Sequence, residues 1–174
     1  NEDYFQRKAT MQDEKGNFFE DNDERMIFFA SGVLETVRKL RWSPDLVHCH
    51  GWFTSLVPLY LKKAYREDPL FADSKVVFSY YNNGFDKPMD KRLQEKAVLN
   101  GVSRDDLAVI KDPTYENLVK LSLQYSDAAI KGSDDLPDNI VDIIKESGKP
   151  SLDYKDPEKY IGEYSVFYEN ILNR

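Results

Sequence analysis

Two histidines are the side chains of this chain best suited to chemistry. His48 and His50 stand at the end of a short apolar segment, 46–49, and the hydroxyls of Thr54 and Ser55 follow close behind. Residues two apart on an extended strand project to the same side, so both imidazoles can face one ligand. A metal site would need a third ligand that the sequence does not fix. We therefore expect one ring to be hydrogen-bonded in the core and the other to line a crevice.

Glycine-containing turns follow two apolar segments and lead into helical ones. Gly51 comes directly after His50, and Gly132-Ser133 follows residues 127–131. A tight turn explains both, but backbone at such a position can also approach a phosphate or a sugar hydroxyl. The GxGxxG fingerprint and the P-loop are absent, so no dinucleotide or nucleotide cofactor is predicted. GxSxG is absent too, and no Ser-His-acid arrangement is predicted.

Apolar runs and helical stripes alternate along the chain and define the elements that position these residues. The predicted strands are 46–49, 75–81, 127–131 and 151–153. The predicted helices are 21–42, 52–65, 88–99, 103–110, 113–125, 136–147 and a last one that begins at Pro157. Residues 1–20 are expected to form the end of a strand followed by a loop or short hairpin.

This alternation predicts an α/β fold in one domain, residues 1–174. The run 75–81 is continuously apolar or aromatic, which is typical of a parallel strand covered on both faces. Right-handed crossovers between such strands give a Rossmann-like, three-layer parallel sheet with helices on both faces. We expect the polar strand ends to meet at one edge of that sheet, where ligands bind in open α/β folds.

Local signals predict how several helices begin and end. Asp21 and Glu24 have the spacing of a capping box, and Asp112-Pro113 reads as an N-cap followed by Pro at the first helical position. Gly148 is expected to end the helix 136–147. The stripe of the first long helix is expected to be core, and its members are Met26, Phe29, Ala30, Val33, Leu34, Val37 and Leu40.

Composition limits the classes of function. The net charge of −7 and the isoelectric point near 4.9 argue against nucleic acid or an anionic membrane as partner. No apolar run approaches the roughly 20 residues that span a bilayer. The single cysteine, Cys49, excludes an intrachain disulfide and fits a reducing compartment, so we expect a cytoplasmic protein. The first residues carry neither Met nor a secretory signal, which suggests a piece of a longer chain.

The order of motifs resembles the starch and glycogen synthases of glycosyltransferase family 5. That family has a D-N-x-x-R-F helix followed by P-D-x-x-H-x-H-D-W-H and L-x-P-x-Y-L. The matching positions are Asp21, Asn22, Arg25, Pro44, Asp45, Val47, His48, His50, Trp52, Pro58, Tyr60 and Leu61. Residues 74–82 are similar to the family's K-x-V-F-T-x-H-N strand, and residues 121–140 to its L-K-x-G segment. The resemblance covers about residues 20–147.

Membership of this family would imply an enzyme with two Rossmann-like domains. Such enzymes transfer glucose from ADP-glucose to the non-reducing end of an α-1,4-glucan, with the acceptor in the crevice between the domains. This chain resembles only the later part of the N-terminal, acceptor-side domain, and looks like a short, divergent single-domain form. ADP-glucose is therefore expected to bind only with a separate donor domain.

Three departures from the family pattern fall at positions of its active site. Gly51 and Phe53 stand where H-D-W-H has its acid and its second histidine, and Tyr81 replaces the histidine of T-x-H-N, while Asn82 is retained. Glycine cannot stabilise an oxocarbenium-like charge, and a phenol does not replace imidazole near neutral pH. We therefore expect no catalytic residue, no metal and no cofactor. The candidate substrate-binding residues are His48, His50, Gly51, Trp52, Thr54, Tyr80, Tyr81, Asn82 and Ser133.

Two functions stay open at this point. One is a divergent α-glucan synthase, or half of one, that works with a separate nucleotide-sugar domain. The other is a catalytically degenerate module that binds α-glucan or malto-oligosaccharide, or regulates, and a ligand-free structural domain is the plainest alternative. A sheet that lacks its first strands would leave an open edge, so a homodimer is also expected.

Overall fold

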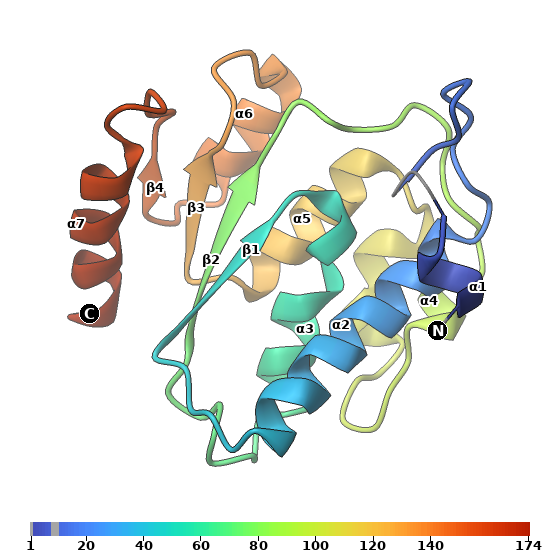
Figure 1. The fold of residues 1–174 in the computed structure, drawn as a ribbon, viewed down its shortest axis with the longest axis horizontal. Coiled ribbons are helices and arrows are strands. Elements are labelled where there is room, and N and C mark those ends of the chain that lie inside the picture. Colours follow the sequence, from blue (N-terminus) through green and yellow to red (C-terminus); the bar gives the residue numbers. More distant parts are fainter. Residues whose placement is uncertain (1, 8–10) are drawn as a thin grey trace.

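A four-stranded parallel sheet, in the order β1-β2-β3-β4, organises the computed structural model, which describes residues 2–7 and 11–174 (Figure 1). The strands are β1 (Leu46–His50), β2 (Lys75–Tyr80), β3 (Ala128–Lys131) and β4 (Ser151–Leu152). All three neighbouring pairs are parallel, and the register sets His48 beside Val77 and Ser79 beside Ile130. The four predicted strands are thus confirmed to within one residue at either end. Because each strand lies next to the one before it, every crossover steps in the same direction.

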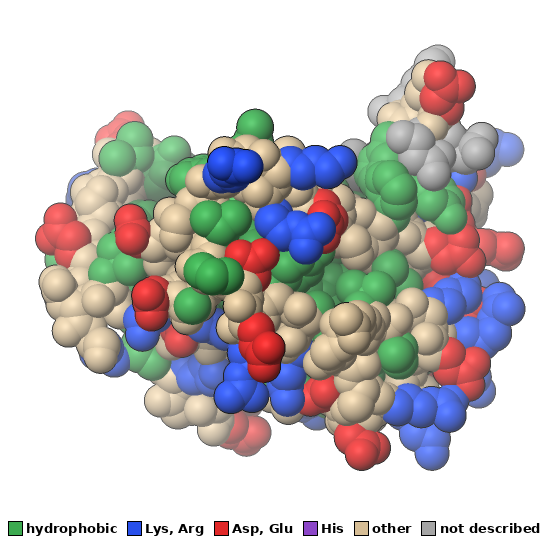
Figure 2. All heavy atoms as spheres, turned by 90° about the horizontal axis from the view of Figure 1, so that it is seen from below, with side chains coloured by type: hydrophobic (Ala, Val, Ile, Leu, Met, Phe, Trp, Pro, Cys, Tyr) green, Lys and Arg blue, Asp and Glu red, His purple; other side chains and the backbone are tan. Residues whose placement is uncertain are grey.

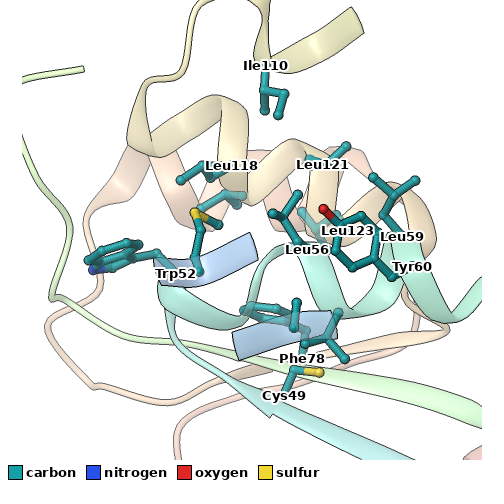
Figure 3. Packing of buried hydrophobic residues seen from close by; sticks show 14 of the residues in the cluster. Cys49, Trp52, Leu56, Leu59, Tyr60, Phe78, Ile110, Leu118, Leu121 and Leu123 are labelled. Carbon is teal, nitrogen blue, oxygen red and sulfur yellow. The ribbon is translucent and has the colours of Figure 1, made fainter. Parts of the chain in front are cut away.

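Most helices cover one face of this sheet. They are α2 (Asn22–Lys39), α3 (Leu56–Lys63), α4 (Leu93–Lys96), α5 (Tyr115–Tyr125) and α6 (Asp138–Glu146), with the 3₁₀ segments η1 (Trp52–Thr54) and η2 (Asp105–Lys111). Their buried side chains form one large core with Cys49, Val76, Phe78 and Tyr80 of the strands. Figure 3 shows Cys49 and Phe78 under side chains of α3 and α5, among them Leu56, Tyr60 and Leu121.

A single helix, α7 (Tyr160–Leu172), covers the opposite face. Figure 1 shows it apart from the other helices, beyond the sheet. Its Ile171 packs in a small separate cluster with Val77, Ala128 and Ile130. The three-layer architecture is therefore confirmed, with very unequal outer layers.

Strand alternation decides which layer each side chain enters. Along β2, Val76, Phe78 and Tyr80 belong to the large core. Val77 belongs to the α7 cluster, and Ser79 contacts His48 on that same side. The two faces of β2 thus have different surroundings. One is packed under five helices, and the other is only partly covered.

Two predicted helix starts are wrong in detail. Asp21 precedes α2 but makes no side-chain cap bond, because its carboxylate binds the guanidinium of Arg7 at 2.8 Å. Glu24 accepts from the Tyr4 hydroxyl at 2.9 Å and so is not free to close a capping box. At α5 the cap is Thr114, not Asp112, since the Thr114 hydroxyl accepts from the Asn117 amide at 3.2 Å.

The segments 88–99 and 103–110 are less helical than predicted. Only Leu93–Lys96 of the first is α-helical, and the second is the 3₁₀ segment η2. The Asp90 carboxylate accepts from the Arg92 amide at 2.9 Å, a local bond that competes with helix formation. Gly148 has the positive φ of 65° expected of a residue that ends a helix, as predicted.

The N-terminal segment departs from its prediction. Glu2–Phe5 form a helical turn, α1, rather than the end of a strand. Of the predicted hairpin, residues 11–20 show one antiparallel bridge, between Gln12 and Phe18. Residues 1 and 8–10, which the same prediction covered, lie outside the described part. Within the described part, no helix combines the length and apolarity needed to cross a membrane.

Candidate functional site

The two histidines lie on the α7 face of β1, as their spacing predicts. Their ring centroids are 3.9 Å apart. His48 is held at both nitrogens, with Nε2 2.7 Å from the Ser79 hydroxyl and Nδ1 2.6 Å from the hydroxyl of Tyr168 on α7. His50 is exposed, and its Nδ1 lies 2.8 Å from the Tyr81 hydroxyl. One imidazole is therefore a hydrogen-bonded structural group and the other is open to solvent.

Partial burial keeps both imidazoles neutral, that of His50 included although one part of its ring is open to solvent. Burial lowers the pKa of His48 to about 3, and the neighbouring His50 adds to this effect. Burial also lowers the pKa of His50 and raises the pKa of the Tyr81 phenol. Near pH 7 this face therefore carries neutral donors and acceptors, which suit hydroxyl groups better than they suit an anion.

No metal site forms around the histidines. The planes of the two rings are tilted by 37°, and both nitrogens of His48 are taken by the hydroxyls of Ser79 and Tyr168. Among residues 2–7 and 11–174, no group of three or more His, Cys, Asp or Glu side chains could hold a metal ion.

The turn after β1 needs glycine. Gly51 has φ 69° and ψ 165°, a combination that essentially only glycine adopts. Its amide donates to the Ser79 carbonyl at 3.0 Å, and its carbonyl accepts from the Thr54 hydroxyl at 3.0 Å. A Cβ at this position would lie 3.9 Å from the Tyr81 ring. Gly51 and Tyr81, two of the three departures from the family pattern, are thus neighbours at one site.

The ends of β2 and β3 are joined by polar contacts. The Asn82 amide donates to the Ser133 hydroxyl at 3.0 Å, and its side-chain nitrogen donates to Asp135 at 2.8 Å. Gly132 packs against the Tyr81 ring, since a Cβ there would lie only 2.6 Å from that ring. The predicted candidates Tyr81, Asn82 and Ser133 therefore do meet at the C-terminal edge of the sheet.

Three other residues lie elsewhere. Trp52 is 3% exposed and packs against Phe18 and Phe85, and Tyr80 is 2% exposed. Both face the helix-covered side of the sheet, so the expectation that they line a crevice is not met. Phe53, the third residue that departs from the family pattern, packs against Phe29 on α2. It makes no ring contact with His50 or Tyr81.

A polar hollow of about 320 Å³ opens beside Asn82 on the helix side of the sheet edge. It lies between the segment after β2 and the first turns of α5 and α6. Its lining residues are Asn82, Gly84, Phe85, Asp86, Tyr115, Glu116, Pro137, Asn139 and Ile140. Carboxylates and amides combine there with aromatic rings, and this mixture can bind sugar hydroxyls and pack on the apolar face of a sugar ring.

Most of this lining is not predicted by the sequence motifs. Tyr115, Glu116 and Asn139 stand in the first turns of two helices, and no motif marks them. Tyr115 is fixed by its hydroxyl, which donates to the Tyr81 carbonyl at 2.9 Å, and Asn139 by its bond to Glu116 at 3.0 Å. Their position at the start of a helix is what could have indicated them. The N-termini of helices that follow parallel strands point to the same edge of the sheet as the strand ends.

A family model described as the starch synthase catalytic domain matches residues 1–149. The chain belongs to this family. Glycogen synthase of Chlorobium luteolum is 46% identical over 83 residues, which are 47% of this chain and 17% of the relative. Glycogen synthase of Chlorobaculum parvum is 31% identical over 134 residues, which are 73% of this chain and 26% of the relative. The chain thus spans a small part of the curated glycogen synthases it matches.

A solved structure supports the fold. The catalytic domain of starch synthase IV from Arabidopsis thaliana, bound to ADP and acarbose, aligns with a TM-score of 0.61. It covers 82% of this chain and 31% of the starch synthase chain, at 15% identity. The resemblance stated from the motifs is therefore confirmed, as is the α/β fold class. In this chain, Gly51 and Tyr81, two residues that depart from the family pattern, lie side by side.

Proposed function

We propose that this starch synthase-like chain binds α-glucan, in the form of malto-oligosaccharides, and transfers no glucose by itself. The observation that carries the proposal is the polar hollow beside Asn82. Asn82 is also the residue of the T-x-H-N motif that this chain retains. Amide, carboxylate and aromatic groups converge on the hollow, and the neutral His50–Tyr81 pair lies at the same sheet edge.

The absence of transfer follows from the groups at the sheet edge. Gly51 has no carboxylate, and the hydroxyl of Tyr81 is hydrogen-bonded to Nδ1 of His50 at 2.8 Å. Neither group can stabilise the positive charge that develops at a sugar carbon during transfer. ADP-glucose would be bound only when a separate donor domain faces this edge, in line with the ADP and acarbose held by the much longer starch synthase IV chain.

Isothermal titration calorimetry tests the binding. We expect maltohexaose to bind weakly, in the millimolar range, and the β-linked cellohexaose to bind less well. Asn139→Ala should weaken binding because it removes a lining amide. Asn170→Ala, which changes an exposed amide on α7, is the matched control. No heat of binding at millimolar maltohexaose, or equal affinity for both sugars, would contradict the proposal.

The second candidate is the acceptor half of an active synthase. It is favoured by the family match over residues 1–149. Incorporation of radiolabelled glucose from ADP-glucose into glycogen by this chain together with a separate nucleotide-sugar domain would support it, and incorporation by the isolated chain would overturn the proposed lack of transfer.

Two further properties belong to this proposal. A cytoplasmic location fits the single cysteine, Cys49, which is buried and unpaired. Self-association as a homodimer fits the sheet, because β1 pairs only with β2 among the described strands, and exposed sheet edges are normally covered.

A further inference from the structure

A second hollow, of about 290 Å³, opens where the first turn of α2 meets the segment that follows β2. We call it the Asp23 hollow. Its lining residues are Phe18, Phe19, Glu20, Asn22, Asp23, Lys87, Pro88, Met89 and Asp90. Aromatic and aliphatic groups combine there with carboxylates and an amide, as they do in the hollow beside Asn82. The two hollows therefore suit the same class of ligand.

One oxygen in the wall of the Asp23 hollow has no partner. The Asp23 side chain is 1% exposed. Within the described part of the chain, its Oδ1 is the one buried side-chain nitrogen or oxygen that finds no hydrogen bond. A buried polar atom in this state destabilises the folded chain unless a donor reaches it. The hollow thus has a specific place for a hydrogen-bond donor.

The nearest cation cannot supply that donor. An ammonium group has three N–H bonds. Lys96 donates all of them to carboxylates, at 2.7, 2.8 and 3.0 Å, and the acceptors are Oδ2 of Asp23, Oε1 of Glu24 and Oδ2 of Asp90. These contacts offset the charge of Asp23 but leave its Oδ1 without a hydrogen. What Oδ1 lacks is therefore a donor and not a counterion, and a neutral hydroxyl group meets this need.

One segment, 84–90, lines both hollows. Its first part lines the hollow beside Asn82, and its last part lines the Asp23 hollow. Phe85, from the first of these walls, packs against Phe18, from the second, with ring centroids 5.0 Å apart. Figure 1 shows the segment leaving the end of β2 and running toward the N-terminal part of the chain. The two hollows are thus neighbours along one stretch of backbone.

The apolar end of α2 gives no comparable indication of a ligand. Leu40, predicted to be core, is 69% exposed there. Figure 2, which views the molecule from below, shows hydrophobic side chains scattered among charged ones rather than gathered in one patch. In contrast, the Asp23 hollow combines enclosed space with an unpaired buried atom.

We infer that the Asp23 hollow is a second subsite for α-glucan, in which a glucose hydroxyl donates a hydrogen bond to Oδ1 of Asp23. The glucan extends from the hollow beside Asn82 along residues 84–90. Phe18 and Pro88 offer apolar surface to the face of a sugar ring. This inference rests on the proposed function, because it adds a further contact for the same ligand.

Backbone amide shifts of the ¹⁵N-labelled whole chain locate the ligand. With maltohexaose, we expect the amides within 18–23 and 87–90 to shift together with those within 82–86, and with one dissociation constant, because a single glucan contacts both hollows. Shifts within 82–86 alone would overturn the inference and leave the proposed function standing. No shift in any of these ranges would overturn both.

A pair of variants tests the role of Oδ1. Asp23→Ala should raise the dissociation constant for maltohexaose about 2- to 12-fold, since it removes one hydrogen bond. Glu24→Ala is the matched control, because Glu24 also accepts from Lys96 in the first turn of α2 but does not line the hollow. Equal affinities of the two variants would overturn the inference. Should Asp23→Ala fail to fold, the amide shifts of the unaltered chain still decide.

Asn139→Ala separates the two subsites, because Asn139 lines only the hollow beside Asn82. If Asn139→Ala weakens binding of maltohexaose and Asp23→Ala does not, the proposed function stands and the inference fails. If Asp23→Ala alone weakens binding, the glucan occupies the Asp23 hollow and the site proposed beside Asn82 fails. A loss in both variants supports one glucan that spans both hollows.

Discussion

At the scale of single residues, Gly132 is restricted by its neighbours. Its amide donates to the Tyr80 carbonyl at 2.7 Å. A Cβ at position 132 would lie 2.6 Å from the Tyr81 ring and 2.9 Å from the Tyr80 carbonyl oxygen. The loop that presents Ser133 therefore packs directly on the tyrosine that stands in the place of the family's histidine.

Gly132→Ala should therefore cost stability. We expect a loss of about 1–3 kcal/mol in the free energy of unfolding, because the added methyl group must displace the Tyr81 ring or the Tyr80 backbone. Urea denaturation measures it. Gly162→Ala is the matched control, since Gly162 lies within α7 with nothing within 4 Å of its added Cβ. Alanine there should stabilise by about 0.5–1 kcal/mol. Equal stability of Gly132→Ala and the unaltered chain would contradict this, because it would show that Tyr81 and the Tyr80 backbone move away from the added methyl group at no cost.

The sequence predicts part of the candidate site at this scale. The shared side of His48 and His50 follows from strand period, and the meeting of Tyr81, Asn82 and Ser133 follows from parallel strand ends. The burial of Trp52 and Tyr80 could not be predicted, because nearness to a strand end does not say which face a side chain takes. Tyr80 and Tyr81 are neighbours in sequence, yet one bonds Ser122 in the helix layer and the other bonds His50.

At the scale of elements, the strands are predicted better than the helix ends. The strands are buried, so their sequences are runs of apolar residues that can be recognised directly. Asp21 stands at the start of α2 but makes no capping bond, because Arg7 binds its carboxylate. Asp112 is not the cap of α5, because the hydroxyl of Thr114, two residues further on, caps that helix instead. The α2 stripe was only half right, since periodicity shows that a face is apolar but not what covers it.

Few buried side chains attach α7 to the sheet. Most of its residues are exposed, and only Ile171 is fully buried. Its polar link to the sheet is the hydrogen bond of the Tyr168 hydroxyl to His48 at 2.6 Å. Few buried contacts and an exposed backbone are the features of a segment that opens locally.

Tyr168→Phe should loosen α7. Removing the hydroxyl costs about 0.5–1.5 kcal/mol, so we expect the α7 amides to exchange with deuterium about 2- to 12-fold faster, while the amides of α5 keep their rate. Native-state hydrogen exchange at pH 7 measures both. Tyr160→Phe serves as the control, because Tyr160 is 42% exposed and meets Tyr164 through its ring. Equal effects of the two variants would mean that the bond to His48 does not hold the helix.

At the scale of the whole molecule, this chain corresponds to only a part of its relatives. The aligned part of this chain covers 17% of one glycogen synthase and 31% of the starch synthase IV chain. The order β1-β2-β3-β4 contains no reversal, so the described sheet has no switch point of its own at which a ligand crevice would open. A second body facing the C-terminal edge would supply the other wall.

Restoring the family's side chains should not restore glucose transfer. Aspartate at position 51 must leave the backbone region that Gly51 occupies, at a cost of about 1–3 kcal/mol, so Gly51→Asp should lower stability in urea. Combined with Tyr81→His it returns the two ionisable groups that would lie side by side at the sheet edge, yet we expect no radiolabelled glucose to pass from ADP-glucose to glycogen. The reason lies at the largest scale: under the proposed function, the groups that bind the nucleotide belong to a separate body facing this edge. Turnover by the double variant alone would contradict this, because it would place a complete donor site within these 174 residues.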